Sequence, residues 1–139
     1  MTPFRRRLLM KKHGPKETLV FEQEFIRLTK VSTTATSAGN SYAFVKGKTY
    51  RYVFDFTLTD LQYPTTSGKI RSQEASYSFL TVNADIGIYN TVHVDSGTNY
   101  VCTNGRTKNV MSARTDTITE GVRDYWSGIV RNLKIYEVS

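Results

Sequence analysis

The most constraining feature of the sequence is "KTYRYVFDFTLTD", residues 48–60, in which apolar and polar side chains alternate. Large apolar residues occupy every second position, namely Tyr50, Tyr52, Phe54, Phe56 and Leu58. The positions between them are polar apart from Val53. A period of two places each set of side chains on one face of an extended strand. The segment is therefore predicted to be an antiparallel strand with one face in a core and the other near water.

The same period recurs between stretches that are rich in turn residues. We expect further strands within residues 18–28, 74–83, 85–94, 98–103, 108–119 and 129–138. Nine Tyr, seven Phe and one Trp favour pleated, half-buried surfaces over helices. The predicted fold is all-β, a jelly-roll-like β-sandwich of about seven or eight antiparallel strands.

Some details of this prediction are specific enough to be tested. In the first strand, Leu19, Phe21 and Phe25 are expected on one face, with a bulge near Phe25–Ile26. Ile86 and Ile88 are expected in phase with Val92 and Val94, and Ile129 in phase with Leu133 and Ile135. The segment 74–83 is expected in the middle of a sheet, and Asn104-Gly105 in a hairpin turn. Loops are expected over residues 30–41, 61–69 and 121–128.

The N-terminal stretch "MTPFRRRLLMKKHGPK" differs from the rest of the chain. Its six cations, without any acid, leave 13 cations and all 12 acids in residues 17–139, which therefore carry a net charge of only +1. We expect two regions: residues 1–16 as an extended or short-helical attachment arm, and residues 17–139 as the β-sandwich domain. A nearly neutral body disfavours nucleic-acid binding by the domain itself.

Three interpretations of the arm follow from its side chains. The residues concerned are Phe4, Arg5, Arg6, Arg7, Leu8, Leu9 and Met10. The apolar members favour docking onto a partner protein, with the cations matching acidic residues around the groove. The alternatives are a solvated, disordered tail and phosphate contact through the arginines. Because phosphate contact does not require bulky apolar side chains, docking is the preferred hypothesis.

The sequence contains no arrangement that indicates catalysis. Its two histidines and single cysteine are scattered, so neither a nucleophile–base pair nor a metal site or cofactor is expected. Cys102 is predicted to be a small core residue and His93 a surface residue on a strand. No apolar stretch is long enough for a membrane helix, and "LLM" is too short for the core of a signal peptide.

Aromatic residues outside the core pattern are the better candidates for a site. Tyr63, Tyr125 and Trp126 lie in predicted loops, and Tyr89 faces away from the row of Ile86 and Ile88. Such rings stack on sugars or anchor protein interfaces. For Trp126 the preferred interpretation is that it folds back and closes one end of the sandwich, ahead of interface use and sugar binding.

Two kinds of resemblance add to this interpretation. "VKGKTYRYVFDFTLTD" and "GIVRNLKIYEV" resemble the recurring strand and the last strand of carbohydrate-binding-module jelly rolls. Asn132 stands where such modules often have an Asp near a structural calcium, so calcium is not expected. "FRRRLLMKK" resembles the N-terminal stretch of many predicted virion proteins in tailed phages of gut Bacteroidetes.

These resemblances imply a function. The chain is expected to be a non-enzymatic virion structural protein, such as a fibre, decoration or tail accessory protein, made in the host cytoplasm. Its partners would be other virion proteins and copies of itself, as a trimer or dimer. The alternatives are a module that recognises cell-surface glycans and, third, nucleic-acid contact through the arm.

Overall fold

The computed structural model describes residues 16–74 and 77–139, which form an all-β domain with no helix in these two ranges. The strands are β1 (Glu17–Val31), β2 (Thr36–Ala43), β3 (Thr49–Leu61), β4 (Gly68–Arg71), β5 (Ser78–Val82), β6 (Thr91–Asp95), β7 (Tyr100–Val101), β8 (Thr107–Thr115), β9 (Ile118–Thr119), β10 (Val122–Arg123) and β11 (Trp126–Val138). The predicted fold class is confirmed.

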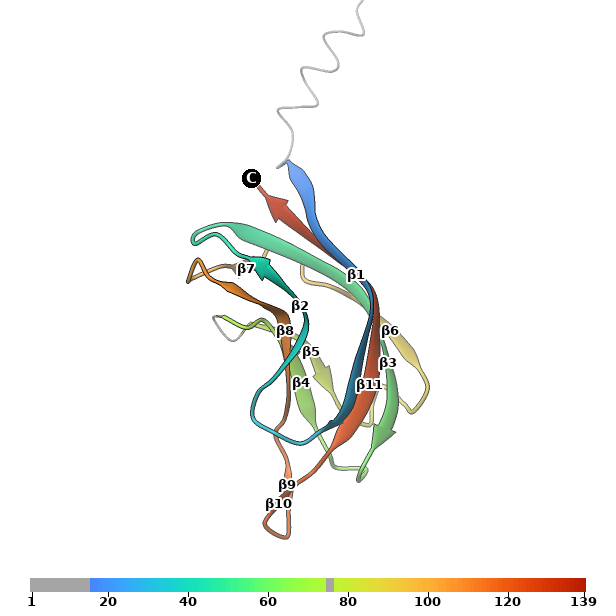
Figure 1. Cartoon of the computed structure of the whole chain (residues 1–139). Helices are drawn as coiled ribbons and strands as arrows, with labels where there is room; N and C mark the ends of the chain where they lie inside the picture. Colours follow the sequence, from blue (N-terminus) through green and yellow to red (C-terminus); the bar gives the residue numbers. More distant parts are fainter. Residues whose placement is uncertain (1–15, 75–76) are drawn as a thin grey trace, which may run out of the picture.

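The strands form two antiparallel sheets that face each other (Figure 1). Sheet A has the order β1-β11-β3-β6, with β7 also paired to β3, and sheet B has the order β2-β8-β4-β5. Successive strands repeatedly cross from one sheet to the other, which is the strand order of a jelly roll. The short hairpin β9–β10 lies outside both sheets.

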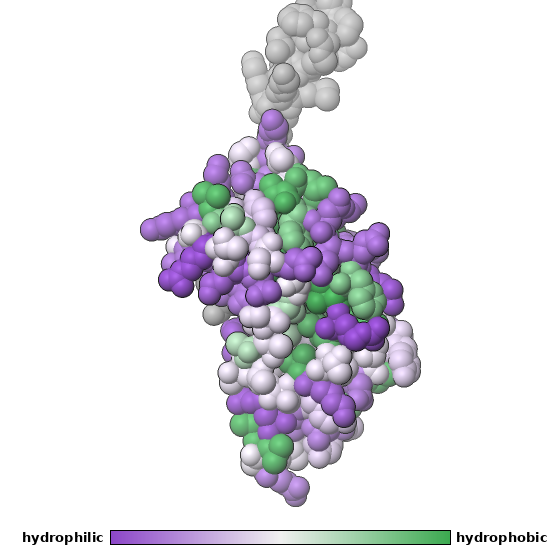
Figure 2. All heavy atoms as spheres, viewed as in Figure 1, coloured by the Kyte–Doolittle hydropathy of each residue, from purple (hydrophilic) through white to green (hydrophobic). Residues whose placement is uncertain are grey.

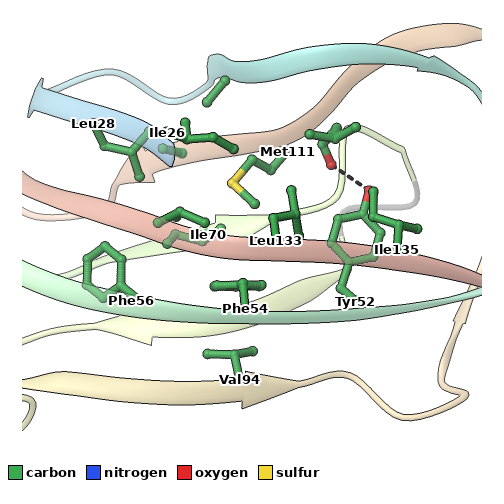
Figure 3. Close-up of a cluster of buried hydrophobic side chains, with 14 of the residues drawn as sticks. Ile26, Leu28, Tyr52, Phe54, Phe56, Ile70, Val94, Met111, Leu133 and Ile135 are labelled. Atoms are coloured by element: carbon green, nitrogen blue, oxygen red, sulfur yellow. Dashed lines mark hydrogen bonds between the residues drawn. The ribbon is translucent and has the colours of Figure 1, made fainter. Parts of the chain in front are cut away.

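The core lies between the sheets and uses the predicted face of β3 (Figure 3). The alternating side chains from Tyr50 to Leu58 are all at most 1% exposed. Sheet B contributes Ile70, Val110 and Met111 from the opposite side. The hydroxyl of Tyr52 donates to the Val110 carbonyl oxygen at 2.5 Å, which ties the two sheets together and satisfies a fully buried polar group.

Strands β1 and β11 change face together, which corrects part of the sequence prediction. Phe25 is 40% exposed rather than inward, while Ile26 beside it is buried. On β11, Val130 and Leu133 are buried, and Asn132 between them has a φ of +55°. The irregular positions of β1 and β11 lie opposite each other, so the pairing of β1 with β11 keeps its register here. The register shift appears instead in the pairing of β11 with β3, between Arg131 and Lys134. Ile129 consequently lies off the buried face predicted for it.

Several element predictions were wrong for identifiable reasons. The Ser/Thr/Gly-rich segment 30–41 contains most of β2, because pairing with β8 outweighs its weak strand propensity. Strand β5 is an edge of sheet B, not a middle strand. Asn104-Gly105 does not close a hairpin, since β7 pairs with β3 in sheet A and β8 belongs to sheet B.

The sandwich has two ends with different roles. At the terminal end, Lys16 and Ser139 exchange two backbone hydrogen bonds of 3.2 and 2.9 Å. At the opposite loop end lie residues 32–35, 62–67 and 83–90 and the hairpin β9–β10 (Figure 1). Figure 2 shows hydrophilic residues over much of the surface in the same view, with hydrophobic patches in the upper half and a smaller one near the lower tip. Ile118 and Val122 of this hairpin are 56% and 68% exposed.

Candidate interaction site at the loop end

Trp126 is buried, which confirms the prediction that it closes one end of the sandwich and corrects its inclusion among the candidates for glycan contact. Its side chain is fully buried, and its indole nitrogen Nε1 donates to the Arg114 carbonyl oxygen at 3.0 Å. The ring meets that of Phe56 edge-on, with centroids 5.8 Å apart. Gly68 leaves the space for the indole, because a Cβ at this position would lie 2.4 Å from Nε1. Trp126 therefore closes the core beneath the loop end.

Tyr63 lines an apolar pocket at the same end. The pocket has a volume of about 290 Å³ and is formed by Leu58, Leu61, Tyr63, Pro64, Ala84 and Ile88. Tyr63 is 39% exposed and Ile88 is 43% exposed, so both remain accessible at its rim. The fold thus brings the loop after β3 against the loop before β6, as required for a composite site.

Tyr89, next to Ile88, is the most exposed of the large hydrophobic side chains in the described residues, at 76%. Its φ is +66°, a conformation that non-glycine residues seldom adopt. The Tyr89 amide donates to the Leu58 carbonyl oxygen at 2.6 Å, and the Leu58 amide donates to the carbonyl oxygen of Asn90 at 3.3 Å. The Asn90 side chain also donates to the Ile86 carbonyl oxygen at 3.0 Å. These bonds hold the loop in one conformation and keep Tyr89 in solvent.

Tyr125 lies nearby but is half-buried. Its amide donates to the Gln62 side-chain oxygen, and the Gln62 amide donates to the Tyr125 carbonyl, both at 3.0 Å. The ammonium of Lys30 lies 5.2 Å from the centroid of its ring. Of the predicted aromatic candidates, Tyr63 lines the pocket, Tyr89 is exposed on the loop that supplies Ile88 to it, and Tyr125 is half-buried beside Gln62.

The buried Asp124 supports the same end, although the sequence analysis did not single it out. Thr66 donates to its carboxylate at 3.0 Å. Desolvation raises the pKa of this carboxyl, but hydrogen bonds from Thr119, Thr117 and Thr66 outweigh desolvation and lower the pKa overall. The carboxylate thus joins the loop 62–67 to the hairpin segment. The available sequence signal was the stretch "DTIT", residues 116–119, whose two threonines lie a few positions before Asp124.

Ile88 was also missed, because the pattern placed it in a strand with Val92 and Val94. In the structure β6 begins only at Thr91, and residues 84–90 form consecutive turns. Gly87, with a φ of +87°, was the signal that the alternating pattern should be interrupted there.

The remaining titratable candidates do not form a catalytic arrangement. Cys102 is buried as predicted, and its thiol donates to Glu74 at 3.0 Å. Burial, followed by this hydrogen bond, raises the pKa of Cys102 to about 11, so the thiol stays protonated at neutral pH. His93 is exposed as predicted, with its Nδ1 2.8 Å from Asp55 on the open face of sheet A. Neither residue lines the loop-end pocket.

The described ranges also lack two further features. They contain no cluster of three or more His, Cys, Asp or Glu side chains with a geometry suited to a metal ion. None of their segments is a helix long and apolar enough to cross a membrane. The predicted docking residues of the arm, Phe4 to Met10, lie outside the described residues.

No family model matches the chain, and no curated protein matches it. Among solved structures, it is similar to a chain in the acid-stable capsid structure of Helicobacter pylori bacteriophage KHP30. The sequences are 12% identical, the TM-score is 0.40, and the alignment covers 88% of this chain and 92% of that chain. At this TM-score the likeness establishes neither a shared topology nor a shared role.

Proposed function

We propose that the chain is a non-catalytic structural protein of a phage particle. It docks into the particle through Phe4–Met10 and displays the β-sandwich domain with its loop end outward. The proposal combines the basic and apolar composition of residues 1–16 with the way in which the domain is closed.

The observation that carries the proposal is the position at which the sandwich starts. Strand β1 begins at Glu17 and pairs with β11 from that first residue, while Lys16 bonds to Ser139. The sandwich thus starts at Glu17, and in this proposal residues 1–15 are assigned to contact with another protein. They join the domain at the terminal end, so attachment there directs the pocket and Tyr89 away from the particle.

The balance of side chains favours docking over charge attraction alone. Burying a Phe or Leu side chain contributes about 1.5–3 kcal/mol, whereas an exposed ion pair contributes about 0–1 kcal/mol. The four apolar residues Phe4, Leu8, Leu9 and Met10 should therefore dominate attachment. The arginines orient the arm by pairing with acids or carbonyl oxygens of the partner.

Incorporation into assembled particles tests this proposal. Replacing Phe4, Leu8 and Leu9 with Ser should prevent attachment even at low salt. Replacing Arg5–Arg7 with Gln should only weaken it, and raised salt should have the same effect on the wild type. The reverse ranking, with the Gln variant inactive and the Ser variant nearly normal, would favour phosphate contact instead. Loss of cooperative unfolding after deletion of residues 1–15 would show that the arm belongs to the core.

A second candidate function, glycan recognition, is favoured by the exposed loop end. Tyr63 presents a partly exposed ring at an apolar pocket, and Tyr89 presents a second exposed ring on the loop that supplies Ile88 to that pocket. Exposed aromatic rings can stack on sugar rings. Tyr89→Ala should then abolish retention on host polysaccharide and leave the melting temperature nearly unchanged. The matched control is Tyr136→Ala, on the outer face of sheet A. Equal retention of wild type and Tyr89→Ala would eliminate this candidate.

A further inference from the structure

We propose that β1 is a homodimer interface, in which two copies pair their β1 strands antiparallel about Ile26 and extend sheet A across both domains. This interface does not involve residues 1–15. It is therefore independent of the docking role proposed above, and either can fail without the other.

The first observation is the free edge of β1. With 15 residues it is the longest border of either sheet, compared with eight for β2 and five each for β5 and β6. Within the described residues it forms a backbone ladder only with β11. Its contact with β2 includes a single bond from the Asn40 amide to the Gln23 side chain, at 2.8 Å. Such an edge offers unpaired N–H and C=O groups to another chain.

The second observation is the order of charges along this edge. Glu22 and Glu24 precede Ile26, while Arg27 and Lys30 follow it, and all four charged residues are exposed. No opposite charge of the described residues lies within 4 Å of any of them. A two-fold axis at Ile26 brings the acidic half of each strand onto the basic half of the other. The strand is thus complementary to itself.

The third observation is the facing of the side chains. Residues that lie opposite each other in an antiparallel pair must project from the same face. Ile26 is buried and Arg27 is exposed, whereas Glu24 and Phe25 are both exposed in succession. Two consecutive outward side chains form a bulge that opposes one residue of a partner strand.

This facing excludes a shift by one residue, and the order of charges then favours the register centred on Ile26. With the two Ile26 residues opposite each other, Arg27 of the second copy faces Glu24 and Phe25 together. Beyond the bulge, Leu28 of the second copy faces Gln23, and both are inward-facing residues. A shift by one residue would oppose inward and outward side chains along the whole interface.

Phe25 lies at the centre of this contact and is 40% exposed in the single domain. The guanidinium carbons of Arg27 and Arg131 lie 5.1 and 5.2 Å from the centroid of its ring. Two cations therefore share one ring, and no described carboxylate is within 4 Å of either. Glu24 of the second copy faces Arg27 and would supply the missing negative charge, while Arg27 of the second copy would cover the exposed ring.

Sedimentation velocity of the full chain tests the proposal by charge exchange. The wild type should sediment with the mass of two chains. Glu24→Arg and Arg27→Glu should each place like charges opposite each other twice and weaken dimerisation at least tenfold. The double variant Glu24→Arg/Arg27→Glu restores the complementary order and should restore the dimer. Glu120→Arg, the same charge change on the exposed turn between β9 and β10, is the matched control and should stay dimeric.

Three outcomes would overturn the interface. The first is a wild type that sediments as a single chain at its highest soluble concentration. The second is a dimer, or a larger assembly, whose mass is unaffected by either single reversal. The third is a double variant that remains monomeric like the single ones, which would show that Glu24 and Arg27 do not face each other.

Discussion

The two ends of the sandwich use aromatic side chains in opposite ways. At the terminal end, rings close the core by packing on one another: Phe44 and Tyr50 meet at right angles with centroids 5.1 Å apart, and Tyr42 contacts Phe44 at 4.9 Å. At the loop end, one ring closes the core, that of Trp126, while Tyr63 and Tyr89 face solvent.

The polar groups differ in the same way. At the terminal end, side chains pair with backbone amides of the loops: the Val45 amide donates to the Tyr50 hydroxyl at 2.9 Å, and the Asn104 amide donates to the buried Glu74 at 3.0 Å. At the loop end, backbone bonds from Leu58 to Tyr89 and Asn90 hold an exposed loop. The terminal end is thus built for closure, and the loop end presents side chains on a rigid support.

The largest expected effect concerns the single ring that closes the loop end. Trp126→Ala should lower the free energy of unfolding by about 3–5 kcal/mol, because it removes a fully buried ring and leaves the Arg114 carbonyl unpaired. Chemical denaturation measures this loss. Tyr63→Ala at the same end should cost less than about 1 kcal/mol, since its ring is partly exposed. Equal losses of stability for the two variants would show that Trp126 and Tyr63 do not differ in their contribution to the core.

The fold was largely predictable because it depends on alternation in long strands. The row from Tyr50 to Leu58 determined the inner face of β3, and no competing pattern obscured it. The misplacements arose where local pattern and tertiary pairing disagree. Phe25 is exposed because β1 follows the bulge that Asn132 makes in the neighbouring strand β11. The alternation of residues within β1 alone does not indicate where β11 is irregular.

The loop-end site was predictable only in part. Tyr63 and Tyr89 were singled out because they break the core pattern, and both are exposed. The pocket lined by Tyr63 and Ile88 depends on the order of strands in sheet A, which brings the loop before β6 beside the end of β3. The prediction that Trp126 closes one end of the sandwich is confirmed, but the sequence did not indicate that Gly68, 58 positions earlier in the chain, leaves room for the indole.

A smaller effect is expected at the terminal end from one hydroxyl. Tyr50→Phe keeps the ring packing but removes the acceptor of the Val45 amide, which should cost about 1–2 kcal/mol in the free energy of unfolding. Tyr89→Phe is the matched control at the loop end, where the hydroxyl is in solvent, and should be neutral. An unchanged stability for Tyr50→Phe would mean that ring packing alone closes this end.

The strained position in the loop predicts a gain in stability. Tyr89→Asn should raise the free energy of unfolding by up to about 1 kcal/mol, because Asn adopts a φ of +66° more readily and the exposed ring contributes little packing. Thermal unfolding measures this change. Tyr63→Asn, whose backbone lacks a positive φ, should give no gain. A destabilised Tyr89→Asn would show that the ring is held by contacts rather than merely presented.

The smallest effect sharpens the account of the terminal end through its pH dependence. Arg51 donates to both carboxylate oxygens of Asp95, at 2.9 and 2.6 Å, and to Glu17 at the start of β1, at 2.9 Å. These bonds from Arg51, together with the Gly97 amide, outweigh desolvation and lower the pKa of Asp95 from 3.8 to about 2. Because the pKa is lower in the folded state, the stabilisation is present above pH ~4 and is lost as the pH falls towards 2.

The groups are partly exposed, with side-chain exposures of 30% for Arg51 and 37% for Asp95, so water and salt screen the pair and its contribution should be below about 1 kcal/mol. Denaturation at pH 5 and pH 2.5 should show a smaller decrease in stability for Arg51→Gln than for the wild type. Lys48→Gln, which removes a looser 3.7 Å pair with Glu137 at the same end, should leave the decrease unchanged. Arg51→Gln could instead lose as much stability between pH 5 and pH 2.5 as the wild type. The pair of Arg51 and Asp95 would then not contribute to the acid sensitivity, which must arise from other carboxylates, such as Asp124 at the loop end.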